Sequence, residues 1–346
     1  MRIAIVNDML MARAALRRAI AEVPDYSLIW TARDGAEAVK RCIKDTPDLI
    51  LMDLIMPVMD GVEATRQIMA QTPCAILIVT ATVEGHTAKV FEALGAGALD
   101  AVQTPVLGAS GQLGGASTLQ LKIETIRQLV SRGSDRRQHG GLDGKLRANS
   151  PPTNPLVVIG ASAGGPAALM VILHDLPGDF SAPIVIVQHI DAQFAPSMAS
   201  WLAEQSALTV RIANDRDHPL AGTALVAASN DHLVFIDSQT LGYTPDPRDC
   251  HYRPSIDVFF ASVMNHWRGE VVAILLTGMG RHGAKGLKAL REAGALTIAQ
   301  DADSCVVYGM PKAAAELSAA VEILPLEKIA SSLMNSIKFM NRRSLS

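Results

Sequence analysis

The sequence is poor in aromatic residues, poor in cysteine, and has no excess of charge of either sign. Phe, Trp and Tyr make up 4% of the 346 residues, too few for a surface on which nucleic-acid bases stack. The 31 Lys and Arg against 34 Asp and Glu leave a formal net charge of −3. No overall positive field therefore attracts nucleic acid or an anionic membrane. We expect no nucleic-acid partner and no direct insertion into a membrane.

The cysteines form neither a metal-binding nor a disulfide pattern, because they are widely spaced and no Cys-x-x-Cys pair occurs. The N-terminus turns acidic after one short apolar run, unlike a signal peptide. The charge-free stretch 156–173 carries glycines and a proline in its middle, unlike a membrane span. We expect a soluble, cytoplasmic protein with free thiols at Cys42, Cys74, Cys250 and Cys305.

Hydrophobic patterning predicts two α/β halves, and the 49% hydrophobic content is enough for two cores. Short apolar runs without alternation, separated by helical patterns, are typical of parallel strands covered by helices on both faces. In the first half we expect strands at 3–6, 28–31, 49–52, 76–80 and 99–102, then a glycine-rich loop at 108–115 and a helix to about 130. In the second we expect a doubly wound sheet with strands at 156–159, 184–188, 271–277 and 295–298, and an antiparallel hairpin formed by 223–227 and 233–236.

Residues 131–154, between the halves, lose the hydrophobic pattern and are rich in Gly, Ser and Pro. This composition is typical of a flexible linker. Its five basic residues outnumber its two acidic ones, which leaves a contact with an acidic surface open, but we interpret it as a solvated connector. The predicted domains are 1–122, with a C-terminal helix to about 130, and 155–340.

Two aspartates and a threonine follow strands of the first predicted sheet. Asp8 follows the first strand, Asp53 ends the third and Thr80 ends the fourth. Carboxyl ends of parallel strands meet at one edge of the sheet, where two carboxylates repel unless a cation such as Mg²⁺ joins them. A carboxylate oxygen there can attack a phosphorus atom that the metal makes electrophilic, and Thr80 can contact the resulting phosphoryl group.

The segment Asp-Leu-Ile-Met-Pro-Val-Met-Asp-Gly at 53–61 resembles the receiver domains of bacterial response regulators, and the resemblance covers 1 to about 122. It implies a flavodoxin-like, five-stranded parallel sheet with phosphorylation at Asp53. It also implies that Mg²⁺ is bound by Asp8, Asp53 and the carbonyl oxygen of Ile55.

Three residues depart from the receiver pattern. Asn7 stands where receivers often have a second acid, and Ala101 replaces an aromatic residue of many receivers. Thr104 stands where the family has a lysine that pairs with the phosphoryl oxygens. Thr104 can donate a hydrogen bond to the phosphoryl group but brings no charge, so we expect phosphorylation to be coupled to activity through a different contact.

A glycine-rich turn around Ser162 opens the second half. Gly-Ala-Ser-Ala-Gly-Gly-Pro at 160–166 follows an apolar strand and starts a helix, and such a turn can expose a serine hydroxyl for acyl transfer. By itself the turn also suits packing or a phosphate cradle. His189 ends the next strand, and adjacent parallel strands lie about 5 Å apart, so His189 can serve as a general base for Ser162.

Three further motifs follow along the chain: Arg-Pro-Ser-Ile-Asp at 253–257, Thr-Gly-Met-Gly-Arg-His-Gly at 277–283 and Tyr-Gly-Met-Pro-Lys at 308–312. With the Ser162 turn they resemble the catalytic domain of chemotaxis protein-glutamate methylesterases (CheB-like), over about 155–340. The resemblance implies Ser162 as nucleophile, His189 as base and the Met279 backbone N–H in the oxyanion hole. Asn7-Asp8-Met9 and Gln103-Thr104-Pro105 resemble the Wsp-type subfamily.

His282 departs from this family, which has aspartate at that position. An aspartate fixes the tautomer of a catalytic histidine and stabilises its imidazolium, and in serine proteases its loss costs about 10⁴ in kcat. We therefore predict an impaired esterase. Asp301 and Asp303 lie on a later loop and could substitute; alternatively, His282 lies away from His189 and the assignment is wrong.

The leading hypothesis is a phosphorylation-gated esterase that removes methyl groups from glutamates of methyl-accepting chemoreceptors, with possible deamidation of glutamines. A histidine kinase of the CheA type would be the phosphodonor, Mg²⁺ would serve the receiver, and ester chemistry would need no cofactor. The alternative is a binding module that accepts phosphoryl groups and docks on receptors while its esterase domain is nearly silent. His282 and Thr104 favour the alternative.

Overall fold

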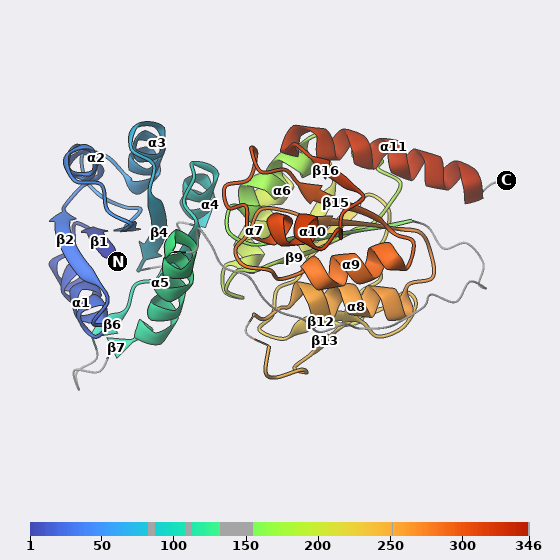
Figure 1. Ribbon diagram of the computed structural model, residues 1–346, viewed down its shortest axis with the longest axis horizontal. Coiled ribbons are helices and arrows are strands. Elements are labelled where there is room, and N and C mark those ends of the chain that lie inside the picture. The colour runs from blue at the N-terminus through green and yellow to red at the C-terminus, as the bar shows by residue number, and fades with distance from the viewer. Residues whose placement is uncertain (82–86, 108–112, 132–154, 251, 345–346) are drawn as a thin grey trace. The chain divides into compact units, whose positions relative to one another are not determined.

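The computed structural model describes residues 1–81, 87–107, 113–131, 155–250 and 252–344 of two compact units, Met1–Gln138 and His139–Ser346 (Figure 1). Apart from Ser131, the predicted linker lies outside the described residues. So do residues 108–112 of the predicted glycine-rich loop.

The first unit is a parallel sheet of five strands in the order β2-β1-β3-β4-β5. Helices α1 and α5 contact one another on one face, and α2, α3 and α4 pack side by side on the other (Figure 1). The order reverses between β1 and β3, so the residues that follow these two strands share the switch point of the sheet, where such folds place ligands. The strands are β1 (Arg2–Val6), β2 (Ser27–Ala32), β3 (Leu49–Met52), β4 (Ala75–Thr80) and β5 (Asp100–Gln103), with a short antiparallel pair β6 (Val106–Leu107) and β7 (Leu113–Gly114). The helices are α1 (Leu10–Ala21), α2 (Gly35–Lys44), α3 (Gly61–Gln71), α4 (Thr87–Gly95) and α5 (Ala116–Ser131).

The second unit is a parallel sheet of seven strands in the order β10-β11-β9-β8-β14-β15-β16. Its chain order changes direction between β8 and β14, which makes the ends of these two strands the switch point. Helices α6, α7 and α11 pack on one face, and α8, α9 and α10 on the other. The strands are β8 (Leu156–Ala161), β9 (Ile184–Gln188), β10 (Thr209–Ile212), β11 (Thr223–Val226), β14 (Val271–Leu275), β15 (Leu296–Gln300) and β16 (Glu322–Leu324). The helices are α6 (Gly165–His174), α7 (Ala195–Glu204), α8 (Ile256–His266), α9 (Ala284–Glu292), α10 (Met310–Glu316) and α11 (Leu326–Ser344).

A hairpin is present, but the predicted pairing of 223–227 with 233–236 is wrong. Residues 223–226 form β11, which pairs in parallel with β9 and β10 inside the main sheet. The hairpin is instead made of β12 (His232–Phe235) and β13 (Leu241–Thr244). Its turn is set by Asp237, whose Oδ1 accepts the backbone N–H groups of Gln239 and Thr240. β11 is a continuous apolar run because it lies inside the sheet, between β9 and β10, and is buried. A hairpin strand with one face in solvent would instead alternate apolar and polar residues.

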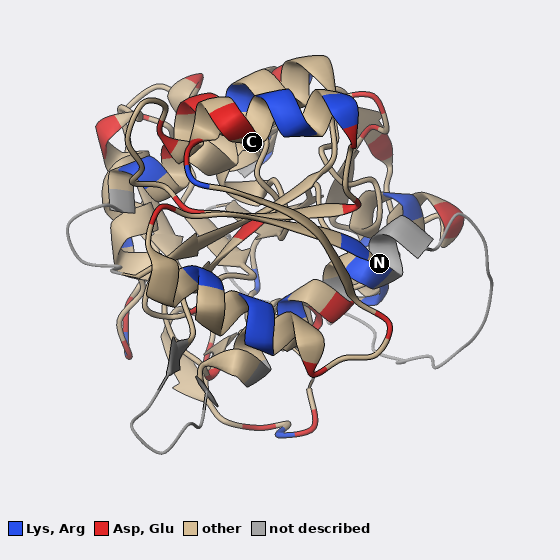
Figure 2. Cartoon of the chain, turned by 90° about the vertical axis from the view of Figure 1, so that its left-hand side faces the viewer, with Lys and Arg blue, Asp and Glu red and all other residues tan. Residues whose placement is uncertain are grey.

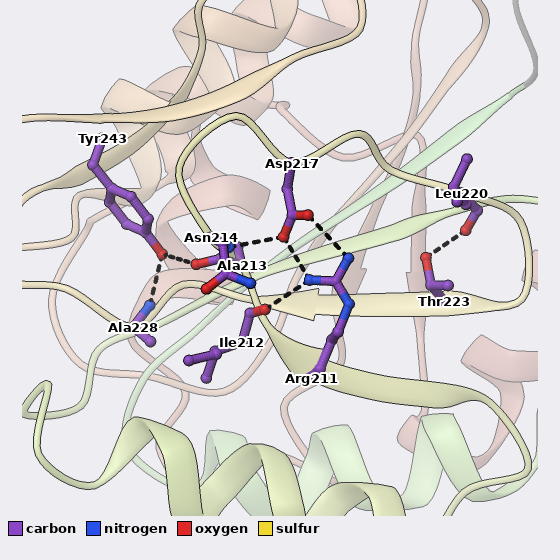
Figure 3. Close-up of polar contacts among 9 residues, drawn as sticks. All are labelled: Arg211, Ile212, Ala213, Asn214, Asp217, Leu220, Thr223, Ala228 and Tyr243. Atoms are coloured by element: carbon purple, nitrogen blue, oxygen red, sulfur yellow. Dashed lines mark hydrogen bonds and ion pairs between the residues drawn. The ribbon is translucent and has the colours of Figure 1, made fainter.

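Tyr243 of β13 joins the hairpin to the main sheet (Figure 3). Its hydroxyl accepts the Ala228 N–H at 3.1 Å and donates to the Ala213 carbonyl at 2.9 Å, at the ends of β11 and β10. Burial of this hydroxyl raises the pKa of Tyr243. Arg211 of β10 pairs with Asp217 on the following loop, so the edge strand is held by polar contacts rather than by a long apolar run.

Charged residues of both signs are spread over the helices and loops, and the strands carry few of them (Figure 2). Among the described residues, no helix combines the length and the apolar character needed to cross a bilayer.

Candidate functional site

Ser162 and His189 follow neighbouring strands in matched register. Ala161 of β8 pairs with Gln188 of β9, and the His189 N–H donates to the Ala161 carbonyl at 3.0 Å. The two residues are therefore the next pair beyond the ladder, where parallel strands lie about 5 Å apart. Both residues are half-buried, and neither makes a side-chain hydrogen bond within the described part of the chain.

The turn that carries Ser162 is fixed by glycines and by Gln188. Gly164 has a φ of +77°, and a Cβ there would lie 2.7 Å from Val306 Cβ, so only glycine fits. The Gln188 amide donates to the carbonyls of Ser162 at 2.9 Å and His189 at 3.1 Å. A Cβ at Gly165 would lie 2.1 Å from Gln188 Oε1. Gln188, which the sequence marked only as a strand end, thus holds both turns together.

The end of β14 packs against the same serine. The Ser162 N–H donates to the Thr277 carbonyl at 3.1 Å, and Thr277 Oγ1 donates to the Ala163 carbonyl at 2.9 Å. A Cβ at Gly278 would lie 2.7 Å from Ser162 Cβ. The Met279 N–H, one residue further on, donates no hydrogen bond among the described residues. A free backbone N–H beside a serine can bind a developing oxyanion.

Three aromatic rings meet at this edge of the sheet. His189 and Tyr252 are stacked, with centroids 4.6 Å apart and planes 7° from parallel. The His282 ring stands edge-on to both, with centroids 5.3 Å from His189 and 4.7 Å from Tyr252. His282 therefore lies beside His189, and the alternative that it sits away from it is excluded. Tyr252 immediately precedes the 253–257 motif, but nothing in that spacing predicted its contact with His189.

No carboxylate takes the place of the missing acid in the described part of the structure. Asp301, at the end of β15, accepts hydrogen bonds from the N–H and hydroxyl of Ser304. It lies three strands from β9, about 14 Å at the usual strand spacing. Asp303 is exposed. Asp257 accepts the N–H groups of Gly283 at 2.9 Å and Gly286 at 2.8 Å, so it caps α9 and fixes the turn that carries His282.

The electrostatics of His189 follow from these contacts. Burial, and to a smaller extent the neighbouring His282, lower the pKa of His189 to about 3. Its Nε2 is buried and has no hydrogen-bond partner among the described residues. The imidazole is therefore neutral at pH 7, and the imidazolium that a general base forms in the reaction has no counter-charge.

In the first unit, Asp53 directly follows β3 at the switch point and is 9% exposed. Its carboxylate accepts the Asn7 amide N–H at 2.8 Å and the Leu54 N–H at 2.7 Å. Burial raises the pKa of Asp53 to about 6, with a smaller contribution from the Asp8 carboxylate. Asn7 thus occupies the acid position of other receivers as a neutral hydrogen-bond donor.

The remaining predicted receiver residues lie around the same edge. Thr80 is buried at the end of β4, and its carbonyl accepts the Thr104 N–H at 2.8 Å. The Thr104 side chain is also buried, and its hydroxyl has no hydrogen-bond partner among the described residues. Asp8 and Ile55 are exposed on the turns after β1 and β3. Asp53 and Thr104 follow β3 and β5 at the same edge of the sheet, with β4 between them.

Both units therefore carry a site at the switch point of a parallel sheet: an acidic site in a receiver-type fold, and a serine and histidine in an α/β fold. These features define a response-regulator protein with a hydrolase-type C-terminal unit. The family models agree: residues 3–109 match the response regulator receiver domain, and residues 157–333 match CheB methylesterase.

Relatives extend the similarity along nearly the whole chain. The chain is 55% identical over 334 residues to a protein-glutamate methylesterase/protein-glutamine glutaminase 3 of Pseudomonas aeruginosa, covering 95% of this chain and 98% of the relative. It is 53% identical to a protein of the same activity name from Mesorhizobium japonicum, covering 97% and 98%. The crystal structure of the Thermotoga maritima CheB methylesterase catalytic domain is 34% identical, with a TM-score of 0.51, over 53% of this chain and 99% of that one. The chain belongs to the CheB methylesterase family and carries its receiver domain.

Proposed function

We propose that this protein hydrolyses glutamate γ-methyl esters on methyl-accepting chemoreceptors and can deamidate receptor glutamines, with Ser162 as nucleophile. The observation that carries this proposal is the pairing of Ser162 and His189 at adjacent strand ends, next to the unbonded Met279 N–H. The activity names of the relatives support the same substrate class.

The reaction uses these groups in turn. Ser162 Oγ attacks the ester carbonyl carbon while the His189 imidazole takes the hydroxyl proton. The Met279 N–H stabilises the oxyanion. Collapse of the tetrahedral intermediate breaks the bond to the methoxy group, which leaves as methanol with the proton from His189. Water then attacks the acyl-enzyme by the same route and frees the glutamate carboxylate. With glutamine, ammonia is the first leaving group.

The histidine at position 282 makes this esterase a slow one. The His189 ring makes no hydrogen bond to a carboxylate in the described residues, and its pKa is lowered rather than raised. In serine proteases, loss of the acid costs about 10⁴ in kcat, yet the oxyanion hole and substrate binding sustain a residual rate.

The receiver unit regulates the esterase through Asp53. A histidine kinase of the CheA type supplies the phosphoryl group, which Thr80 and Thr104 contact. The residues fit Mg²⁺: besides burial, the Asp8 carboxylate raises the pKa of Asp53, and a hard cation held by Asp8, Asp53 and the Ile55 carbonyl would remove this repulsion. When bound, Mg²⁺ supplies charge neutralisation for phosphoryl transfer. The residues at 7–9 and 103–105 favour a Wsp-type pathway.

A second function is favoured by the same departures. His282 beside His189, and Thr104 in place of a lysine, suit a protein that accepts phosphoryl groups and docks on receptors with little ester hydrolysis.

The deciding experiment measures methanol released from methylated receptor by the wild type, Ser162→Ala and Asp53→Asn, each with and without a small phosphodonor and Mg²⁺. Release by the wild type above Ser162→Ala, increased by the phosphodonor only when Asp53 is present, supports the regulated esterase. Equal release by the wild type and Ser162→Ala, with Asp53 still phosphorylated, supports the binding module.

A further inference from the structure

Tyr252 stacks on the catalytic base His189, which lacks the carboxylate partner that the family has. A general base must become an imidazolium in the transition state, and in this chain no carboxylate meets the His189 ring in the described residues. The second histidine, His282, stands edge-on at 5.3 Å and opposes rather than favours that positive charge.

Tyr252 offers the one favourable electrostatic contact that the described residues give this ring. The two planes are 7° from parallel at 4.6 Å, so the negative face of the phenol lies directly against the imidazole. A cation within about 6 Å of such a face is attracted to it, more strongly where water is excluded. Because His189 Nε2 is buried, the contact lies in such an environment.

The loop that carries Tyr252 is held in place from two sides. His232, fully buried in β12, accepts the Ser255 N–H on Nδ1 at 3.0 Å and meets the Pro247 carbonyl through Nε2 at 3.1 Å. Ser255 in turn caps α8. The edge of Tyr252 is also closed by the His282 ring at 4.7 Å. These contacts therefore hold the Tyr252 ring in position against His189 before substrate binds.

We infer that Tyr252 is a positioning residue for the ester reaction, whose aromatic face orients His189 and stabilises its imidazolium in place of the missing carboxylate. This inference rests on the proposed function of Ser162 and His189. Tyr252 acts through His189 and forms no bond with the substrate. Its contribution is realised only when His189 is protonated, so it falls on kcat and not on KM.

The test compares side chains that keep or remove the aromatic face. Tyr252→Phe keeps it and should retain the wild-type kcat within about twofold. Tyr252→Leu keeps an apolar side chain but loses the aromatic face, and the range for cation–π contacts predicts a loss of about 2- to 30-fold in kcat with KM unchanged. Tyr252→Met gives the same comparison if the leucine variant unfolds. Thermal unfolding of each full-length variant is the control for folding.

A second readout does not need the receptor. The rate at which a fluorophosphonate labels Ser162, followed by mass spectrometry, reports activation of the serine by His189 and should fall in parallel with kcat. In the His282→Asp background, where a carboxylate supports the imidazolium, the leucine substitution should cost less.

The inference is overturned if Ser162 is labelled equally fast with Leu and Tyr at position 252, if Phe and Leu are equally impaired, or if the loss lies in KM. Failure of the proposed function looks different. Methanol release no faster than Ser162→Ala, with labelling still dependent on the ring at position 252, rejects the substrate and leaves Tyr252 in its role. No labelling of the wild type above Ser162→Ala rejects the nucleophile and the inference together.

Discussion

Replacing His282 with aspartate should turn a slow esterase into a fast one. The His189 and His282 rings are 5.3 Å apart, so a carboxylate at position 282 lies about 5 Å from the base. At an effective dielectric constant of about 20, a carboxylate and an imidazolium at that distance attract by about 3 kcal/mol. This corresponds to about 10²-fold in rate. A hydrogen bond that fixes the tautomer brings the upper limit near the 10⁴ seen in serine proteases.

The assay is methanol release from methylated receptor by wild type, His282→Asp and His282→Asn, with Ser162→Ala as the blank. Asparagine has the size of aspartate without its charge, so we expect no gain from it. Equal rates for the Asp and Asn variants would refute the electrostatic argument. A wild type as fast as the Asp variant would show that His189 needs no acid, and the assignment of position 282 would be wrong.

Three further substitutions test the electrostatics of the two sites. The pKa of Asp53 in the folded protein, about 6, lies above its unfolded value, so ionisation of Asp53 lowers the free energy of unfolding as pH rises through 6. In metal-free buffer at pH 7, Asp53→Asn should therefore raise the free energy of unfolding by about 1–3 kcal/mol. Mg²⁺ should stabilise only the wild type. The effect of His189 on stability has the opposite pH dependence. Its pKa of about 3 lies below the unfolded value of about 6.5, so its contribution to the free energy of unfolding is present above pH 6.5 and is lost as pH falls towards 3. Urea titrations at pH 7 and 5 should show the wild type losing on the order of 1 kcal/mol more than His189→Gln, and equal losses would contradict the burial of the ring. Thr104→Val removes a buried hydroxyl without a partner among the described residues and should raise the unfolding free energy by about 1 kcal/mol; a lower melting temperature would mean that the hydroxyl is hydrogen-bonded.

Local sequence was sufficient where a strand is a short, purely apolar run. Residues 49–52 and 184–188 were predicted with the observed bounds of β3 and β9, since strands buried on both faces show no alternation. Edge strands were harder. β10 reads Thr-Val-Arg-Ile and β16 has only three residues, so both were missed. β11 was paired with the wrong neighbour because the strand beside it, β9, lies about forty residues earlier in the chain.

The sequence by itself determined the chemistry that is available: a serine in a glycine-rich turn, a histidine at the end of a strand, aspartates after β1 and β3, and a histidine where the family has an acid. These depend on residue identity and on spacing within a few residues, which sequence records directly. Only the tertiary structure decided which of these groups meet. The register of β8 with β9 sets Ser162 next to His189, the capped turn after β14 brings His282 to the same ring, and the loop before α8 stacks Tyr252 upon it. Such contacts join segments up to about 90 residues apart, and they exist because parallel strands gather the ends of distant segments at one edge of a sheet.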